Sequence, residues 1–100
     1  MIKYSISIAG NVCGIEIDGH AGYAEAGQDI VCAGMSMLAY ALAESLRRTG
    51  ELQVMHEQAG HMELRFKRTR KSLWRLDVFR AGAQLLREQY PEHVQLSRGD

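Results

Sequence analysis

The sequence predicts an α+β fold: an antiparallel sheet of about four strands, arranged as two hairpins, with two helices packed on it in the order β-β-α-β-β-α. Three observations support this class. Residues 2–8 and 12–18 alternate apolar with polar side chains, as strands with one buried face do, and residues 53–66 contain a second such pair. Residues 30–48 and 73–90 repeat apolar side chains every three or four positions, which is typical of amphipathic helices. Two hairpins and two helices favour a sheet covered on one face.

The first hairpin is predicted from alternation on both sides of a tight turn. One face of its first strand carries Ile2, Tyr4, Ile6 and Ile8. Gly10 and Asn11 then form the turn. On the second strand Cys13 shares the apolar face, so we expect it to be a buried apolar side chain and not the disulfide partner of Cys32. His20 follows at the mouth of this hairpin.

The first helix begins at a residue suited to cap it. Asp29 can accept hydrogen bonds from the free backbone N–H groups two or three residues further on, which makes Cys32 the third helical residue. The predicted core stripe comprises Val31, Met35, Leu38, Leu42 and Leu46. Cys32, Ser36 and Tyr40 fall on a different stripe, turned away from that core. The thiol is therefore predicted to be displayed, and Gly50 to end the helix.

The second half of the chain repeats the hairpin and helix. Strands are predicted over 53–57 and 61–66, and Ser72 is expected to cap the second helix. Its predicted apolar stripe comprises Trp74, Val78, Ala81, Gly82, Leu85 and Leu86. Pro91 ends the helix, and we expect residues 91–100 to be a polar, frayed tail. Residues 1–100 thus form a single domain.

Charge and cysteine content narrow the class of partner. Twelve basic and twelve acidic side chains cancel, so direct nucleic-acid binding and binding to an anionic membrane are not expected. Six bases do gather within residues 65–75, either as a solvated strand end and helix start or as a surface for docking to a ribosome or an acidic substrate. Two cysteines without a signal-peptide pattern or a long apolar run favour the cytoplasm.

His20 and Cys32 are the strongest chemical pair in the sequence. A thiolate at a helix N-terminus is stabilised by the helix dipole, and a neighbouring imidazole can act as its base. The plainer interpretation, in which His20 ends a strand and Cys32 packs at a helix start, remains open on spacing alone. Asp29 either only caps the helix or also orients His20, and Ser36 bonds either within the site or to its own helix.

Metal and cofactor chemistry is not expected. The candidate ligands His20, Cys32, His56 and His61 show neither a C-x-x-C nor an H-x-x-x-H spacing, so we predict no metal site and no cofactor.

The segment between His20 and Cys32 has the composition of a mobile loop. Residues 21–28 are rich in alanine and glycine, and so offer little side-chain area to hold one conformation against backbone entropy. We predict a substrate lid in which Gly22 and Gly27 act as hinges and Tyr23 packs on an apolar substrate side chain.

Two motifs carry a family resemblance. Asp18-Gly19-His20-Ala21, and Gly27 to Gly34 (GQDIVCAG) followed by Ser36, resemble the ribosomal-processing cysteine protease (Prp) family, and the element order extends the likeness across nearly the whole chain. The resemblance implies a catalytic dyad of His20 and Cys32 supported by Gly19, Asp29 and Ser36. It also implies a homodimer that removes a short N-terminal extension from the precursor of large-subunit ribosomal protein twenty-seven.

The sequence leaves three functions to compare. The first is that cysteine endopeptidase, acting through an acyl-enzyme. The second is a non-catalytic, ribosome-associated binding module in which the dyad is inert and the basic segment binds. The third is a prophage relative that processes a virion protein, since the family has such members. Met35 and Met37 are bulkier than the residues usual after the cysteine, which affects fine specificity.

Overall fold

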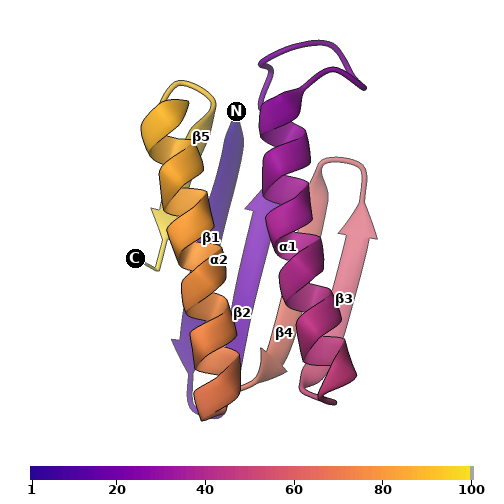
Figure 1. Ribbon diagram of the computed structural model, residues 1–100, viewed down its shortest axis with the longest axis vertical. Coiled ribbons are helices and arrows are strands. Elements are labelled where there is room, and N and C mark those ends of the chain that lie inside the picture. The colour runs from indigo at the N-terminus through magenta and orange to yellow at the C-terminus, as the bar shows by residue number, and fades with distance from the viewer. Residues whose placement is uncertain (100) are drawn as a thin grey trace.

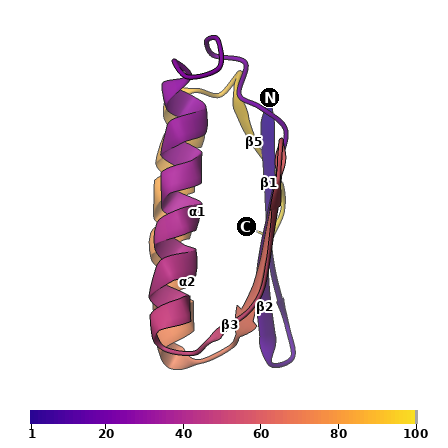
Figure 2. The same ribbon diagram turned by 90° about the vertical axis from the view of Figure 1, so that its right-hand side faces the viewer.

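The computed structural model describes residues 1–99 and places a five-stranded sheet behind two long helices (Figures 1 and 2). The elements are β1 (Ile2–Ala9), β2 (Val12–Asp18), α1 (Ile30–Arg48), β3 (Leu52–Gln58), β4 (His61–Lys67), α2 (Arg70–Gln89) and β5 (Val94–Arg98). The strands lie in the order β3-β4-β2-β1-β5. Both helices cover the same face (Figure 2). The predicted α+β class, its two antiparallel hairpins and the placement of the helices are confirmed.

The frayed tail was a wrong prediction, because the chain beyond Pro91 returns to the sheet as β5. This strand pairs in parallel with β1, with Ile2 opposite Val94, and makes the sheet mixed. Val94 is buried and Leu96 packs against the core. Two apolar residues among polar ones are too short a pattern to identify a strand, and the pairing is with a segment at the other end of the sequence.

The core lies between the sheet and the helices. The buried stripe of α1 contains Val31, Met35, Ala39, Leu42, Ala43 and Leu46, close to the predicted set. Leu38 points toward α2 instead, where a β-carbon added at Gly82 would lie only 2.6 Å from its Cδ2 atom. Gly82 therefore lets the two helices approach each other closely.

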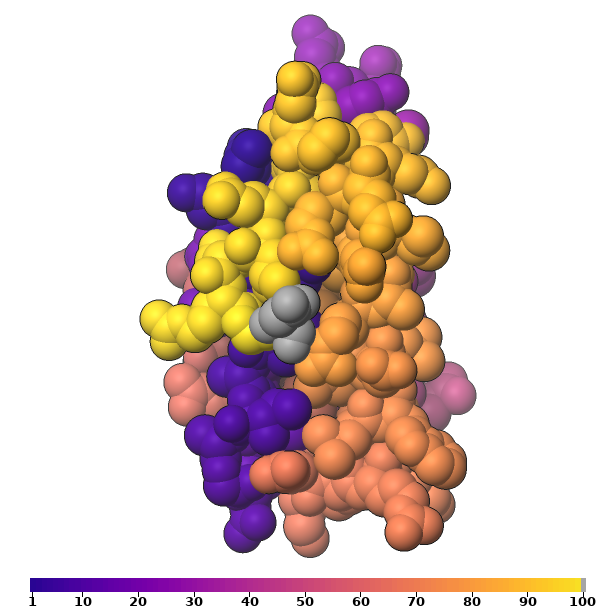
Figure 3. Space-filling model, turned by 90° about the vertical axis from the view of Figure 1, so that its left-hand side faces the viewer, coloured from indigo at the N-terminus to yellow at the C-terminus, as the bar shows by residue number. Residues whose placement is uncertain are grey.

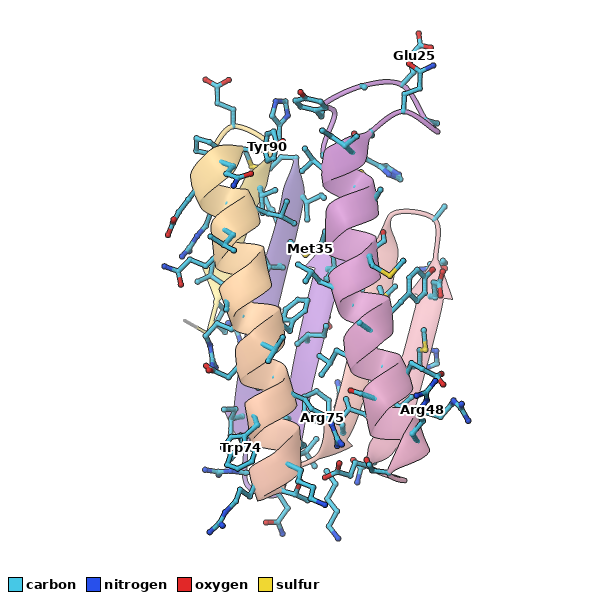
Figure 4. The ribbon with its side chains drawn as sticks, viewed as in Figure 1. Glu25, Met35, Arg48, Trp74, Arg75 and Tyr90 are labelled. Carbon is cyan, nitrogen blue, oxygen red and sulfur yellow. The ribbon has the colours of Figure 1, made fainter. Side chains whose placement is uncertain are left out.

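The predicted stripe of α2 was wrong in phase. Its buried residues are Ser72, Leu76, Phe79 and Ala83. Trp74 and Val78 are instead 68% and 70% exposed, and Figure 4 shows Trp74 near the start of the helix, pointing outward. The cap also differs: Thr69 is the N-cap, and Ser72 completes a capping box with it from inside the helix. Apolar residues lie on two faces of α2, so spacing alone selected the longer set.

The carboxylate of Glu51 links the end of α1 to the start of α2, at the lower end of the molecule where Figure 4 labels its partner Arg75. Glu51 is 8% exposed and its Oε1 accepts from Thr49 Oγ1 and Arg75 Nη1, both at 2.6 Å. The Thr69 hydroxyl donates to its other oxygen. Hydrogen bonds from Thr49 and Thr69 and the nearby guanidinium of Arg75 lower the pKa of Glu51. This group joins the end of α1 to the start of α2, and Figure 4 shows Arg75 directed into that junction.

By length and hydropathy alone, α1 could cross a membrane. Its apolar stripe, however, lies against the sheet, and core helices of water-soluble folds commonly pass the same test. The helix is therefore explained by its place in the core.

Candidate active site

The site is organised at the start of α1, where Asp29 caps the helix as predicted. One carboxylate oxygen, Oδ1, accepts from the N–H groups of Val31 and Cys32 at 3.1 and 3.0 Å. The other, Oδ2, accepts from the N–H of Tyr23 at 3.1 Å. The hydrogen bond from the Cys32 N–H is the main cause that lowers the pKa of Asp29. The same side chain thus starts the helix and fixes the loop before it.

Cys32 is the third residue of α1 and is half-buried. Its Sγ atom accepts a hydrogen bond from the N–H of Ala21 at 3.1 Å. That N–H and the positive end of the helix dipole both attract negative charge to this position. The second free cysteine, Cys13, is fully buried, and burial raises its pKa, so it is placed as a core side chain and not as a nucleophile.

His20 is placed by two close backbone approaches. The preceding Gly19 has φ +89°, and a β-carbon there would lie 2.4 Å from the carbonyl oxygen of Met1. The N–H of Gly19 donates to the carbonyl of Gly60 at 2.8 Å. The imidazole then lies over Gly60, where a β-carbon would be 3.2 Å from Nε2. Gly19 is therefore needed for the close approach of the backbone to Met1, whereas the contact over Gly60 is made by the end of an exposed side chain.

His20 and Cys32 line one pocket of about 150 Å³, together with Gly19 and Ser36. Within residues 1–99, however, no hydrogen bond joins the imidazole to the sulfur, which is bonded to Ala21 instead. The side chain of His20 is exposed and has room to turn. The structure therefore brings the two residues of the predicted dyad into one pocket, but their side chains are not hydrogen-bonded to each other.

Two polar pairs at the pocket rim were missed by the sequence analysis. His61 Nδ1 lies 2.6 Å from Asp18 Oδ1, and this hydrogen bond raises the pKa of His61. Tyr40 donates to the carboxylate of Glu57. The only signal in the sequence is the strand register, which sets Asp18 opposite His61 across β2 and β4.

The predicted lid residues Gly22, Tyr23 and Gly27 are all exposed, and none is among the residues of 1–99 that line this pocket. The Tyr23 ring packs edge-on against Tyr90 and His93, with ring centroids 5.3 and 5.5 Å away. The first part of the loop is therefore held by the turn that follows α2, and the lid role stays a prediction.

Other candidate centres are weaker. Across residues 1–99, no group of three or more His, Cys, Asp and Glu side chains is arranged to hold a metal ion. A larger hollow of about 530 Å³ lies over the strands, on residues that include Ser5, Ser7 and Gly14, but it includes neither His20 nor Cys32.

A thiol at a helix N-terminus that shares a pocket with an imidazole is the arrangement of cysteine hydrolases. Residues 1–95 match the family model described as Cysteine protease Prp, and the chain belongs to that family. It is accordingly a cysteine protease.

Solved structures share the fold across nearly the whole chain. The essential ribosomal processing protease Prp from S. aureus, in complex with a covalently linked product peptide, is 24% identical with a TM-score of 0.85, over 98% of this chain and 99% of that one. The same protease with a substrate peptide gives 24% and 0.78 over the same shares. SMU.848 from Streptococcus mutans gives 29% and 0.72, over 99% and 94%. A comparison with curated proteins finds no match.

Proposed function

We propose that this protein is the endopeptidase that removes the N-terminal extension of large-subunit ribosomal protein twenty-seven, with His20 and Cys32 as a catalytic dyad. The observation that carries the proposal is the shared pocket of these two side chains at the start of α1. Membership of the Prp family supports it, as does the ribosomal processing role of the S. aureus protease of the same fold. Such a substrate would place the enzyme in the cytoplasm.

The chemistry follows from the two side chains. His20 turns from Gly60 toward Cys32 and takes the thiol proton, and the sulfur attacks the scissile carbonyl carbon. The carbonyl electrons move to oxygen, the C–N bond then breaks, and His20 returns the proton to the leaving amine. Water, deprotonated by His20, attacks the acyl-enzyme and frees the thiol and the carboxylic acid.

The first N–H groups of a helix commonly bind an oxyanion, but here those of Val31 and Cys32 already donate hydrogen bonds to Asp29. The N–H of Ala21 instead points at the reacting sulfur from 3.1 Å, and so lies beside the carbonyl group that the sulfur attacks, on whose oxygen the negative charge develops. We assign the oxyanion to this N–H group, in keeping with the preorganised donors of acyl-transfer sites.

The binding-module alternative loses support from its own basic segment. Arg65 forms an ion pair with Glu63, and Arg75 with Glu51, so part of the segment serves the fold. Figure 4 places Arg75 at the end of the molecule opposite Tyr90 and the loop. The segment is thus remote from the pocket. A virion substrate would use the same pocket and is a question of specificity.

We also propose a homodimer. Met37 on α1 is 65% exposed, and Trp74, Val78 and Leu85 stand out on α2. A small domain that exposes such side chains on its helical layer gains by covering them with a second copy. Sedimentation at micromolar concentration should show a dimer, and a monomer alone would refute this part of the proposal.

The decisive experiment uses the organism's own precursor of ribosomal protein twenty-seven and weighs the products. Wild-type protein should release one N-terminal peptide, whereas Cys32→Ala and His20→Ala should release none while keeping their melting temperatures. Cleavage by Cys32→Ala would remove the dyad from the mechanism. An intact precursor, combined with cleavage of a virion protein precursor, would leave the dyad and overturn the substrate.

A further inference from the structure

The turn that follows α2 reaches the loop that begins at His20. The ring nitrogen Nδ1 of His93 lies 2.9 Å from the carbonyl oxygen of Ala21. Ala21 is buried, with 2% of its surface exposed, and His93 is half-buried, so this bond is partly shielded from water. Figure 3 shows the yellow C-terminal segment and the end of α2 lying below the purple atoms of the loop.

The chemistry of the two atoms fixes the direction of this bond. A carbonyl oxygen only accepts, so Nδ1 of His93 carries a proton and donates it. The N–H of the same Ala21 donates to Cys32 Sγ at 3.1 Å. Ala21 is therefore held on its carbonyl side by His93 and points its N–H at the sulfur.

His93 is itself held firmly. Its N–H donates to the carbonyl of Tyr90 at 2.9 Å, and its own carbonyl accepts from the N–H of Ile2, also at 2.9 Å. The imidazole also packs edge-on against the ring of Tyr23. The side chain thus projects from a fixed turn between α2 and the sheet, and can fix a loop that is otherwise exposed.

We propose that His93 is a positioning residue that holds the N–H of Ala21 at the sulfur of Cys32. The inference rests on the proposed function, in which Cys32 is the nucleophile. The carbonyl and the N–H of Ala21 belong to the two successive peptide groups that meet at its Cα atom. Without the bond from His93, the backbone at this residue is free to turn, and the sulfur loses a donor that favours its negative charge. The same donor would be lost to the oxyanion.

Two matched variants separate this role from simple packing. His93→Phe keeps an aromatic ring against Tyr23 but has no N–H to donate. His93→Asn keeps an N–H near the position of Nδ1 but lacks the ring. Tyr23→Ala removes the ring contacts to His93 and Tyr90 but leaves the hydrogen bond from His93 to Ala21 in place. If His93→Phe does not fold, His93→Leu serves as the second variant without a donor.

The readouts are the alkylation of Cys32 by iodoacetamide across pH, the kinetics of peptide cleavage, and the melting temperature. We expect His93→Phe to lower both alkylation near neutral pH and kcat on the order of tenfold, the worth of one hydrogen bond. KM and the melting temperature should change little, and the alkylation profile should move to higher pH. His93→Asn should recover most of the rate, and Tyr23→Ala should keep the wild-type alkylation profile.

Wild-type alkylation in His93→Phe would overturn the proposal, and so would equal losses in the Phe and Asn variants that follow their melting temperatures. Alkylation needs no substrate, so it is read even if the ribosomal precursor is not cleaved. Cleavage by Cys32→Ala would instead refute the proposed nucleophile. The two failures are therefore distinguishable.

Discussion

A carboxylate stabilises each end of α1, but the two differ in burial and in the groups that donate to them. Asp29, at the start, accepts chiefly from backbone N–H groups and lies beside an exposed loop. Glu51, just beyond the end, is buried and accepts from the side chains of Thr49, Thr69 and Arg75. The lower end is thus closed by a side-chain network, whereas the upper end leaves its loop in water.

The two ends of α1 therefore contribute differently, the end at Glu51 mainly to stability and the end at Asp29 mainly to the proposed chemistry. A buried, fully bonded carboxylate costs the fold heavily when one partner is lost. Loss of a half-buried helix cap costs less, and the loop beside it remains exposed beyond the Tyr23 N–H that the cap holds. We therefore expect substitutions at the lower end to change unfolding, and substitutions at the upper end to change cleavage.

We expect the largest difference between the variants of the two cysteines, in cleavage rate and in unfolding free energy. Cys32→Ala should lower cleavage by a factor on the order of a thousand or more, with little change in melting, because Cys32 is only half-buried at the edge of the core. Cys13→Ala should do the reverse, costing about 1–2 kcal/mol of unfolding free energy while activity is kept. Peptide cleavage and urea unfolding measure both. Loss of activity in Cys13→Ala at temperatures where it is folded would break the separation.

The next effect is at the lower end. Glu51→Ala should cost about 3 kcal/mol of unfolding free energy, because it leaves the Thr69 hydroxyl without its acceptor and Arg75 without its carboxylate partner, and should leave kcat unchanged. Urea unfolding tests the first part and peptide cleavage the second. Glu44→Ala is the matched control: its exposed pairs with Arg47 and Arg48 should give no measurable change.

The contribution of Glu51 to stability should also depend on pH. The pKa of Glu51 is lowered in the folded protein from its ordinary value of 4.5. Its stabilising contribution is therefore fully present above pH 4.5 and is lost as the pH falls through the folded value. Wild-type protein should lose more of its melting temperature than Glu51→Gln on acidification below pH 4.5. Parallel curves would mean that the carboxylate is not ionised in the network.

A smaller effect is expected at the upper cap. Asp29→Ala should lower the melting temperature by a few degrees and reduce cleavage, since both the helix start and the Tyr23 N–H lose their acceptor. Asp29→Ser can still cap α1 but is too short to hold Tyr23 as well. Serine should therefore restore the melting temperature more fully than the rate. Full recovery of both by serine would limit Asp29 to a cap.

The smallest effect concerns exchange of backbone amides in the loop. In Cys32→Ala, we expect the amides of residues 25–27 to exchange fast without substrate and more slowly with a bound peptide. The amide of Tyr23 should be slow in both states, because it is hydrogen-bonded to Asp29. Equal exchange of residues 25–27 in both states would remove the lid from the mechanism.

Local patterns predicted most of the fold and the pair of side chains that shares the pocket. The Asp29 cap and both hairpins depend on residues close in sequence, and both were found. Cys32 is less displayed than its stripe predicted, because it is half-buried and packs against the edge of the core. The errors were non-local. The phase of α2 depends on which apolar face meets the sheet, and β5 depends on a partner strand at the other end of the chain.

The parts of the site that the sequence could not predict have the same cause. Ala21 offers no side-chain chemistry, and its contribution comes from a backbone N–H aimed at sulfur. His93 contacts it across 72 positions of sequence. Only the three-dimensional arrangement brings such groups together, so motif and spacing carry no trace of them.

The pairing of the first strand with the last has a consequence for the order of folding. The two hairpins and two helices need only local contacts, whereas Ile2 meets Val94 after nearly the whole chain has been brought round. Closing such a long loop costs more chain entropy than forming a hairpin. We expect pulse-labelling exchange to protect the amides of β3 and β4 before those of β5. The turn bearing His93 would then dock late, and the thiol would gain its backbone donor as one of the final steps of folding.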